Sequence, residues 1–137
     1  MSFELWRPKK YPYIVGSVPS HVRPLIDDAL RDIQTRGCVA FDYRLAADTP
    51  QWSGICVRHV RTWRIVAAFW DPATIALLRI QEHKSNIDLY GTFADDLGIP
   101  KVTGPRNAPR RDRPSCCDNE GLSPLSEQIR SVLDEFF

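Results

Sequence analysis

The chain lacks several features that mark whole classes of protein. It has no CxxC pair, and none of its apolar runs approaches the ~18 residues that cross a membrane. Its first residues, MSFELWRPKKYPYIVG, lack the apolar centre of an export signal. The formal net charge is only +1, so overall charge does not indicate a nucleic-acid binder. We therefore expect a cytoplasmic protein that neither spans nor binds a membrane.

Residues that bind metals or form disulfides are sparse. The four cysteines are Cys38, Cys56, Cys116 and Cys117, and the three histidines are scattered. The adjacent pair Cys116-Cys117 has poor spacing for a zinc site, so we expect no metal ion and no other cofactor. A chain of this size and apolar content has little need of a disulfide framework, so we also expect a reducing cytosol.

The apolar content does support a core. With 137 residues, 43% of them apolar, the chain is long enough for one folded domain. Composition divides it into a folded domain at 1–100, a flexible Pro/Arg-rich linker at 101–121 and a C-terminal amphipathic helix at 122–137. That helix either completes the core or folds back to regulate the domain. Its apolar face comprises Leu125, Ile129, Val132, Leu133 and Phe136.

A first long helix is predicted between Ser20 and Gly37. Ser20 is a suitable N-cap, Pro24 is tolerated in the first turns, and Gly37 is a suitable residue for the C-terminal end. Apolar residues recur between them at helical spacing, which predicts one buried face. They are Val22, Leu25, Ile26, Ala29, Leu30 and Ile33.

Three strands are predicted at 54–60, 62–70 and 74–80, because these segments are rich in β-branched and aromatic residues. The turn signal Asp71-Pro72 separates the last two and favours an antiparallel meander. Alternation along the second strand assigns its residues to two faces. One face has Trp63, Ile65, Ala67 and Phe69, and the other has Arg64, Val66, Ala68 and Trp70.

Shorter elements complete the prediction. FELW and YIVG near the N-terminus each have the composition of a short strand, the segment 38–52 holds a further short strand and a loop, and 86–98 is a short helix. The predicted fold class is α+β: a small antiparallel sheet of about four strands, with the N-terminal helix packed on one face and a short C-terminal helix.

Basic residues concentrate on the predicted strands. Between residues 55 and 84 five Lys or Arg stand against two acids, and His59 and His83 add to them. A locally basic sheet inside a nearly neutral chain can bind phosphates. The five basic residues are Arg58, Arg61, Arg64, Arg79 and Lys84.

The order of three segments carries a resemblance to a known family. WRIV contains Arg64, the aliphatic strand TIALLRI follows, and EHKSNIDLY then brings His83, Lys84 and Tyr90. This order, over roughly residues 20–99, resembles the RelE/ParE superfamily of bacterial toxins from type II toxin–antitoxin pairs, and the loop looks like the YafQ branch. The resemblance implies that 1–100 is a toxin domain whose partners are a cognate antitoxin and mRNA, often on the ribosome.

The implied activity is metal-independent cleavage of mRNA, with the RNA 2′-OH as nucleophile. In that reaction Arg64 holds the scissile phosphate, His83 is the acid or base, Lys84 neutralises phosphate, and Tyr90 stacks on a base or donates a proton. The remaining basic residues of the strands contact the RNA backbone in this interpretation. They are Arg58, Arg61 and Arg79.

Each of these residues also has an interpretation without catalysis. His83 is then a surface loop histidine, Tyr90 covers the core, and His59, in mid-strand, is structural. The corresponding alternative for the protein is a non-enzymatic binding module of the same fold. Such a module would inhibit a protein target such as DNA gyrase, as the ParE branch does, or would pair with an antitoxin.

Overall fold

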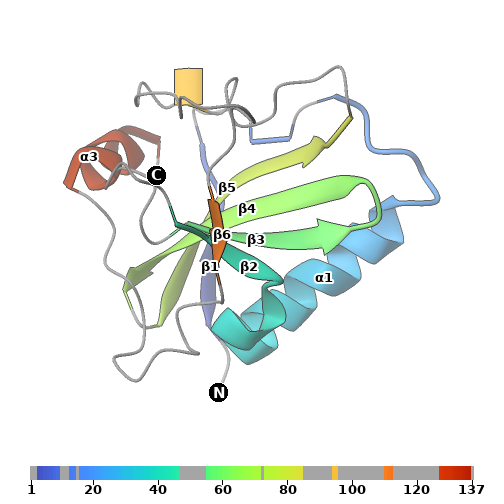
Figure 1. The fold of residues 1–137 in the computed structure, drawn as a ribbon, viewed down its shortest axis with the longest axis horizontal. Coiled ribbons are helices and arrows are strands. Elements are labelled where there is room, and N and C mark those ends of the chain that lie inside the picture. Colours follow the sequence, from blue (N-terminus) through green and yellow to red (C-terminus); the bar gives the residue numbers. More distant parts are fainter. Residues whose placement is uncertain are drawn as a thin grey trace.

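A mixed β-sheet with the strand order β1-β5-β4-β3-β2-β6 forms the centre of the protein in the computed structural model (Figure 1). The structure describes residues 3–9, 13–14, 16–46, 55–71, 73–84, 94–95, 110–112 and 127–136. Helix α1 (Arg23–Arg36) packs on one face of the sheet. The predicted α+β class is therefore confirmed.

The central strands are those predicted from the sequence. They are β3 (Ile55–Val60), β4 (Trp63–Asp71) and β5 (Thr74–Glu82), paired antiparallel in that order. A two-residue loop joins β3 to β4 and sets Val60 opposite Trp63. At the next turn the backbone N–H of Ala73 donates to Asp71 Oδ1 at 2.8 Å, which is the turn chemistry expected of aspartate.

The edges of the sheet differ from the prediction. Strand β1 (Glu4–Trp6) runs parallel to β5, whereas β2 (Tyr43–Ala46) pairs antiparallel with β3. Strand β6 (Arg110–Asp112) pairs antiparallel with β2 and lies inside the stretch predicted to be a flexible linker. The sheet is thus mixed and six-stranded rather than antiparallel with about four strands. Three short strands, β1, β2 and β6, extend the three-stranded central meander, and β1 is parallel to its neighbour.

Helix α1 begins later than expected. A turn in which Pro19 O accepts the N–H groups of Val22 and Arg23 precedes it, so the N-cap is Val22 rather than Ser20. The helix ends as predicted at Gly37, whose φ of +67° suits glycine. A Cβ atom there would also collide with the ring of Phe3, so two constraints select glycine.

Both faces of the sheet are covered. The predicted alternation along β4 is confirmed, because Trp63, Ile65, Ala67 and Phe69 belong to the core under α1. Val66 and Ala68, on the opposite face, are nevertheless 0% exposed. On that face lies helix α3 (Glu127–Phe136), where Arg130 Nη2 donates to Trp70 O at 2.7 Å and the guanidinium stands 4.8 Å from the centre of the Trp70 ring.

The C-terminal helix is thus confirmed over 127–136, and its contact is with the sheet. The side chains predicted to form its apolar face lie outside what the structure describes. Of the short helix predicted at 86–98, the structure describes only residues 94–95, which are helical. Within the described part of the chain no helix is long and apolar enough to cross a membrane.

The cysteine prediction is wrong at one position. Cys38, buried in the 3₁₀ turn η1 (Gly37–Ala40) that follows α1, is disulfide-bonded, and Cys56 is buried in the sheet. Disulfides persist mainly in oxidising compartments, so the cysteine pattern no longer supports a reducing cytosol. The cytoplasmic location stays a prediction.

Candidate functional site

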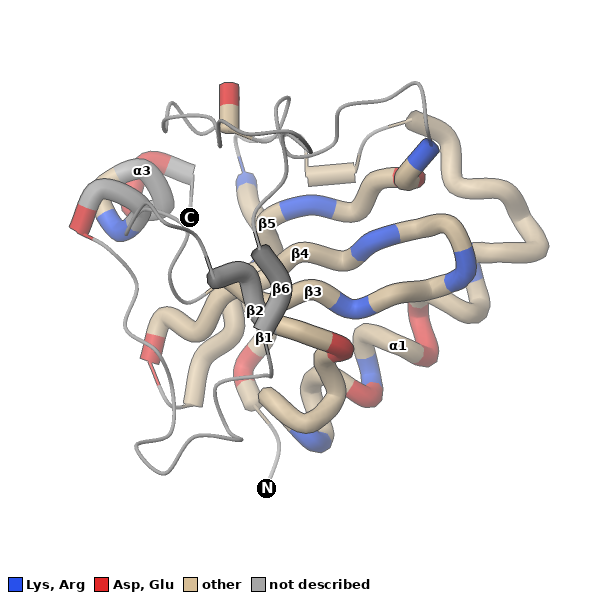
Figure 2. Tube along the Cα trace, viewed as in Figure 1, with Lys and Arg blue, Asp and Glu red and all other residues tan. Residues whose placement is uncertain are grey.

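Basic residues line the three central strands and the hairpin that joins β3 to β4, whereas α1 has both signs of charge (Figure 2). Two features of the structure decide which of these basic side chains can act together. One is the alternation of side chains along each strand, and the other is the register between strands.

Four polar residues share the face of the sheet that points away from α1. Arg64 on β4 lies opposite His59 on β3 and opposite Gln81 on β5. The backbone N–H of His83 donates to Thr62 O at 2.7 Å, so the pairing of the two strands continues past the end of β5. His83 is two residues beyond Gln81 and therefore lies on the same face. We call His59, Arg64, Gln81 and His83 the polar row.

Local contacts hold the polar row in place. Arg64 Nη1 donates to two carbonyls at the hairpin, Arg61 O at 2.9 Å and Trp63 O at 3.0 Å. The backbone N–H of His59 donates to Asp42 Oδ2 at 2.6 Å, and its ring meets the ring of Tyr43 edge-on with centroids 5.2 Å apart. Arg64, His59 and His83 are half-buried and Gln81 is buried, so the protein itself orders the row.

The hairpin beside the row has an unusual backbone. Arg61 has φ +56°, and it is the only residue other than glycine with a positive φ in the described ranges. A two-residue hairpin loop requires such a conformation, for which glycine or asparagine is the usual choice. The predicted RNA-binding residue Arg61 is exposed at this loop, next to Arg64.

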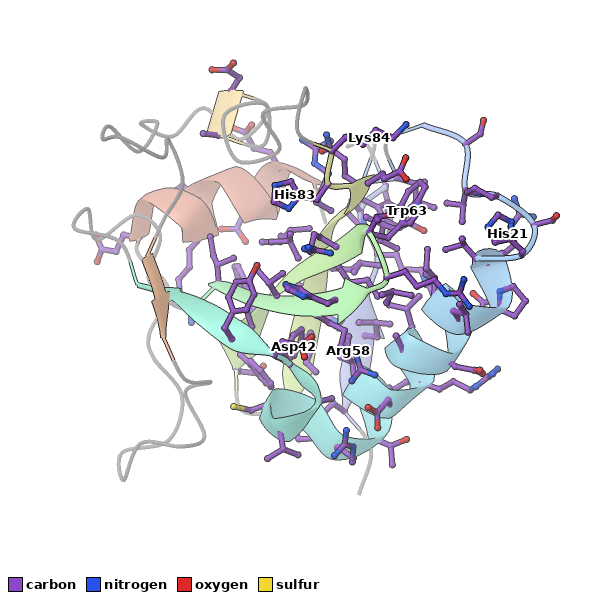
Figure 3. The ribbon with its side chains drawn as sticks, turned by 45° about the vertical axis from the view of Figure 1, so that its right-hand side comes forward. His21, Asp42, Arg58, Trp63, His83 and Lys84 are labelled. Carbon is purple, nitrogen blue, oxygen red and sulfur yellow. The ribbon has the colours of Figure 1, made fainter. Side chains whose placement is uncertain are left out.

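Lys84 does not join the polar row. Its Nζ lies 3.1 Å from Glu82 Oε1, and the hydrogen bond from Lys84, with a smaller one from Thr62, lowers the pKa of Glu82. Glu82 lies opposite the core residue Trp63, so alternation puts Lys84 towards the α1 side of the sheet. Figure 3 shows the side chains of His83 and Lys84 pointing apart.

Arg58 also lies on the α1 side and has a structural role. Its Nη1 donates to Asp32 Oδ2 at 2.7 Å and to Ala40 O at 2.6 Å, which ties β3 to α1 and η1. The hydrogen bond from Arg36, and then that from Arg58, lowers the pKa of Asp32 to about 2 from an ordinary 3.8. The predicted contact of Arg58 with RNA does not fit this geometry, because its charge is already compensated.

A further predicted residue, Arg79, lies in the core. Arg79 faces away from α1 but is only 1% exposed, which makes it one of the largest fully buried side chains of the described core. It lies opposite the buried Val66, outside the polar row, so the prediction that Arg79 binds RNA does not fit the row's geometry. Tyr90 lies outside the described residues.

Gln81 was not among the residues predicted for the site, and His59 was predicted to be structural. The β3–β4 hairpin is the signal that identifies His59, because a two-residue loop at Arg61-Thr62 sets His59 opposite Arg64. Gln81 follows from the second hairpin only after allowance for the irregularity between Val66 and Ala67, which shifts the register of β5.

A separate hollow of about 400 Å³ lies between α1, the end of β5 and the N-terminal segment. No residue of the polar row lines it; its charged residues are Arg7, Arg23 and Asp27. Within the described ranges no group of three or more His, Cys, Asp or Glu residues is placed to hold a metal ion.

No family model, no curated protein and no solved structure matches this chain. The fold and the site themselves define an α+β protein whose central sheet has a guanidinium between two imidazoles on one face. Such a set of side chains can bind a phosphate and move protons, and it contains no carboxylate that would repel an anion.

Proposed function

We propose that the chain is the toxin of a toxin–antitoxin pair and acts as a metal-independent endoribonuclease on mRNA in the cytoplasm. The observation that supports the chemistry is the polar row, in which Arg64 stands between His59 and His83 on one face of the sheet. The order of WRIV, TIALLRI and EHKSNIDLY, which resembles the RelE/ParE superfamily, supports the role as a toxin.

The spacing of the row suits a phosphodiester. Adjacent strands are about 4.8 Å apart, and His83 lies two residues beyond the line from His59 to Arg64, so the Cα atoms of the two histidines are separated by roughly 10–12 Å. Imidazoles that reach inwards from such positions leave room for one phosphate at Arg64. The guanidinium can then donate to the non-bridging oxygens as their charge grows.

The proposed reaction has one displacement at phosphorus. One imidazole accepts the proton of the 2′-OH, the 2′-oxygen forms a bond to phosphorus, and the bond from phosphorus to the 5′-oxygen breaks. The other imidazole, in its protonated form, gives a proton to the departing 5′-oxygen. The products are a 2′,3′-cyclic phosphate and a 5′-hydroxyl, and every proton is carried by a histidine of the row.

The test uses the full-length protein and a labelled single-stranded RNA in excess chelator. We expect cleavage to proceed, with a 2′,3′-cyclic phosphate identified by mass spectrometry, and His83→Ala to slow it by ~10²-fold or more. His21→Ala is the matched control, because His21 is exposed and lies beside the start of α1, away from His83 (Figure 3). Loss of cleavage on chelation that magnesium restores would contradict the mechanism.

The same experiment separates the enzyme from the binding module of the same fold. If expression arrests growth while purified protein and ribosome-bound mRNA show no cleavage, the ribonuclease proposal fails. A gyrase supercoiling assay with the same protein would then test the ParE-like alternative directly.

A further inference from the structure

Two neighbouring polar atoms of the row are buried without a partner. Gln81 is 4% exposed, and its Oε1 has no hydrogen-bond partner in the part of the chain that the structure describes. The same holds for Nε of Arg64, whose Nη1 is used at the hairpin. The two residues lie directly opposite each other on β5 and β4.

Such atoms are uncommon in folded proteins. Almost all buried polar groups are hydrogen-bonded, because a group taken out of water without a replacement partner destabilises the fold. A leucine or methionine at position 81 would fill the same space without this cost. An amide retained there is therefore explained best by a ligand that supplies the missing hydrogen bond.

The two atoms need complementary groups on a ligand. Gln81 Oε1 is an acceptor and needs a donor, whereas Arg64 Nε–H is a donor and needs an acceptor. Side chains directly opposite on adjacent strands have Cβ atoms about 5 Å apart, so the ligand must present its donor and its acceptor close together. Neither atom alone specifies a ligand, whereas an acceptor and a donor held at this separation do.

We propose that this pair recognises the ribose 2′-OH and the phosphate attached to the same ribose. This inference rests on the proposed ribonuclease function and adds to it a specificity-determining residue, Gln81. The 2′-OH donates to Gln81 Oε1, and a non-bridging phosphate oxygen accepts from Arg64 Nε–H. In RNA these two groups are on neighbouring atoms of one nucleotide, and DNA lacks the donor.

The recognition is of the sugar and not of the base. A glutamine that reads adenine uses both ends of its amide, as acceptor and as donor, on one base edge. Here the acceptor Gln81 Oε1 lies beside the Nε–H donor of Arg64 on the next strand. An acceptor and a guanidinium donor side by side match a sugar hydroxyl and a phosphate. In the bound complex Gln81 holds the hydroxyl beside its phosphorus atom. When the reaction begins, the hydroxyl turns its proton from Gln81 Oε1 to the accepting imidazole, and the histidines of the row then move the protons.

The test measures binding of three single-stranded oligonucleotides of one sequence: RNA, DNA and 2′-O-methyl RNA. The protein carries His83→Ala so that cleavage of the RNA is slow on the time scale of the measurement, and fluorescence anisotropy gives the affinities. We expect RNA to bind at least ~10-fold more tightly than either of the others, because 2′-O-methyl RNA keeps the ribose but has lost the donor. This protein keeps Gln81, so its equal affinity for RNA and 2′-O-methyl RNA would by itself overturn the inference.

A variant gives the second measurement. Gln81→Met should abolish the preference for RNA while the melting temperature stays the same or rises, since a buried unpaired amide is replaced by a side chain of similar length. Gln34→Met, at an exposed position on α1, is the matched control and should keep the preference. A lower melting temperature with an unchanged preference would show that Gln81 is structural.

The results also distinguish this inference from the proposed function. Wild-type protein that prefers RNA to 2′-O-methyl RNA but cuts neither would support the recognition and contradict the nuclease. Cleavage of RNA at the wild-type rate by Gln81→Met, with its preference intact, would contradict the recognition and leave the nuclease in place.

Discussion

Arg58 and Arg64 are six residues apart on adjacent strands, yet the protein uses them in opposite ways. Arg58 points to the α1 side, where Asp32 and Ala40 O hold its guanidinium in a partly buried contact. Arg64 points to the other side, where it contacts carbonyls of its own hairpin and keeps Nε without a partner among the described residues. The first compensates the charge of Asp32, and the second keeps a donor that our proposal assigns to a phosphate.

The difference extends to the two faces of the sheet. On the α1 side lie the predicted RNA-binding residue Arg58 and the predicted catalytic residue Lys84, and each is paired with a carboxylate, that of Asp32 or Glu82. On the opposite side the polar row has no carboxylate member. Successive side chains along a strand point to opposite faces of the sheet. A shift of one residue therefore moves a basic side chain from the face with the ion pairs to the face with the polar row. Substitutions on the two faces should therefore affect different measurements.

The largest effect is expected from the polar row. Arg64→Ala combined with His83→Ala should lower the rate of RNA cleavage by at least ~10²–10³-fold, because it removes a charge-assisted phosphate donor and a proton-transfer group. Expression of the wild-type chain without a partner should arrest bacterial growth, and the double variant should relieve the arrest at matched expression.

The comparison of the two faces provides the control for this experiment. Lys84→Ala removes a cation close by in sequence but on the other side of the sheet, where it pairs with Glu82. We expect it to change cleavage far less than the double variant does. Undiminished toxicity in a well-folded double variant would remove Arg64 and His83 from the mechanism.

On the α1 face the expected effect is on stability. Arg58→Ala should lower the free energy of unfolding by ~2–3 kcal/mol, because two charge-assisted hydrogen bonds are lost at a site that is only partly exposed. Arg31→Ala is the matched control. It breaks the pair between Arg31 and Asp28, whose side chains are 72% and 65% exposed respectively, and should cost under ~1 kcal/mol. Chemical denaturation measures both, and equal losses would contradict the distinction.

The central part of this fold was predictable from sequence because its signals are local. Periods of 3.6 and 2 residues located α1 and β3–β5, and Asp71 marked the turn between β4 and β5. The polar row was half predictable: Arg64 and His83 came from the family resemblance, whereas His59 needed only the two-residue hairpin to be placed opposite Arg64.

The remaining features depend on partners distant in sequence, which local patterns do not show. Strand β1 pairs with β5 about seventy residues later, and β6 lies in a stretch whose composition resembles a linker. The ion pair of Arg58 with Asp32 and the burial of Arg79 are tertiary outcomes as well. An arginine in a strand has the same sequence signature whether it meets a carboxylate, the core or a ligand.

A smaller effect is expected where α3 contacts the sheet. Arg130→Ala should lower the free energy of unfolding by ~1–2 kcal/mol, because it removes a hydrogen bond to Trp70 O and a cation–π contact with the Trp70 ring. Arg130→Lys should recover part of this loss. Thermal unfolding followed by tryptophan fluorescence tests the contact, and a melting temperature equal to that of the wild type would show that α3 adds no stability through Arg130.

The smallest expected effect is the pH dependence that Asp32 contributes on the α1 face. Its pKa in the folded protein is about 2, below its ordinary value of 3.8, so its ion pairs stabilise the fold at pH values above 3.8. That contribution is lost as the pH falls from 3.8 through about 2, where the folded protein also takes up the proton. The pKa difference corresponds to at most ~2.5 kcal/mol, and solvent screening reduces it to about 1 kcal/mol. Urea denaturation of the wild-type protein and of Asp32→Asn over this pH range should show the difference between their free energies of unfolding shrinking as the pH falls. A difference that stays constant would mean that the carboxylate charge of Asp32 does not stabilise the α1 face.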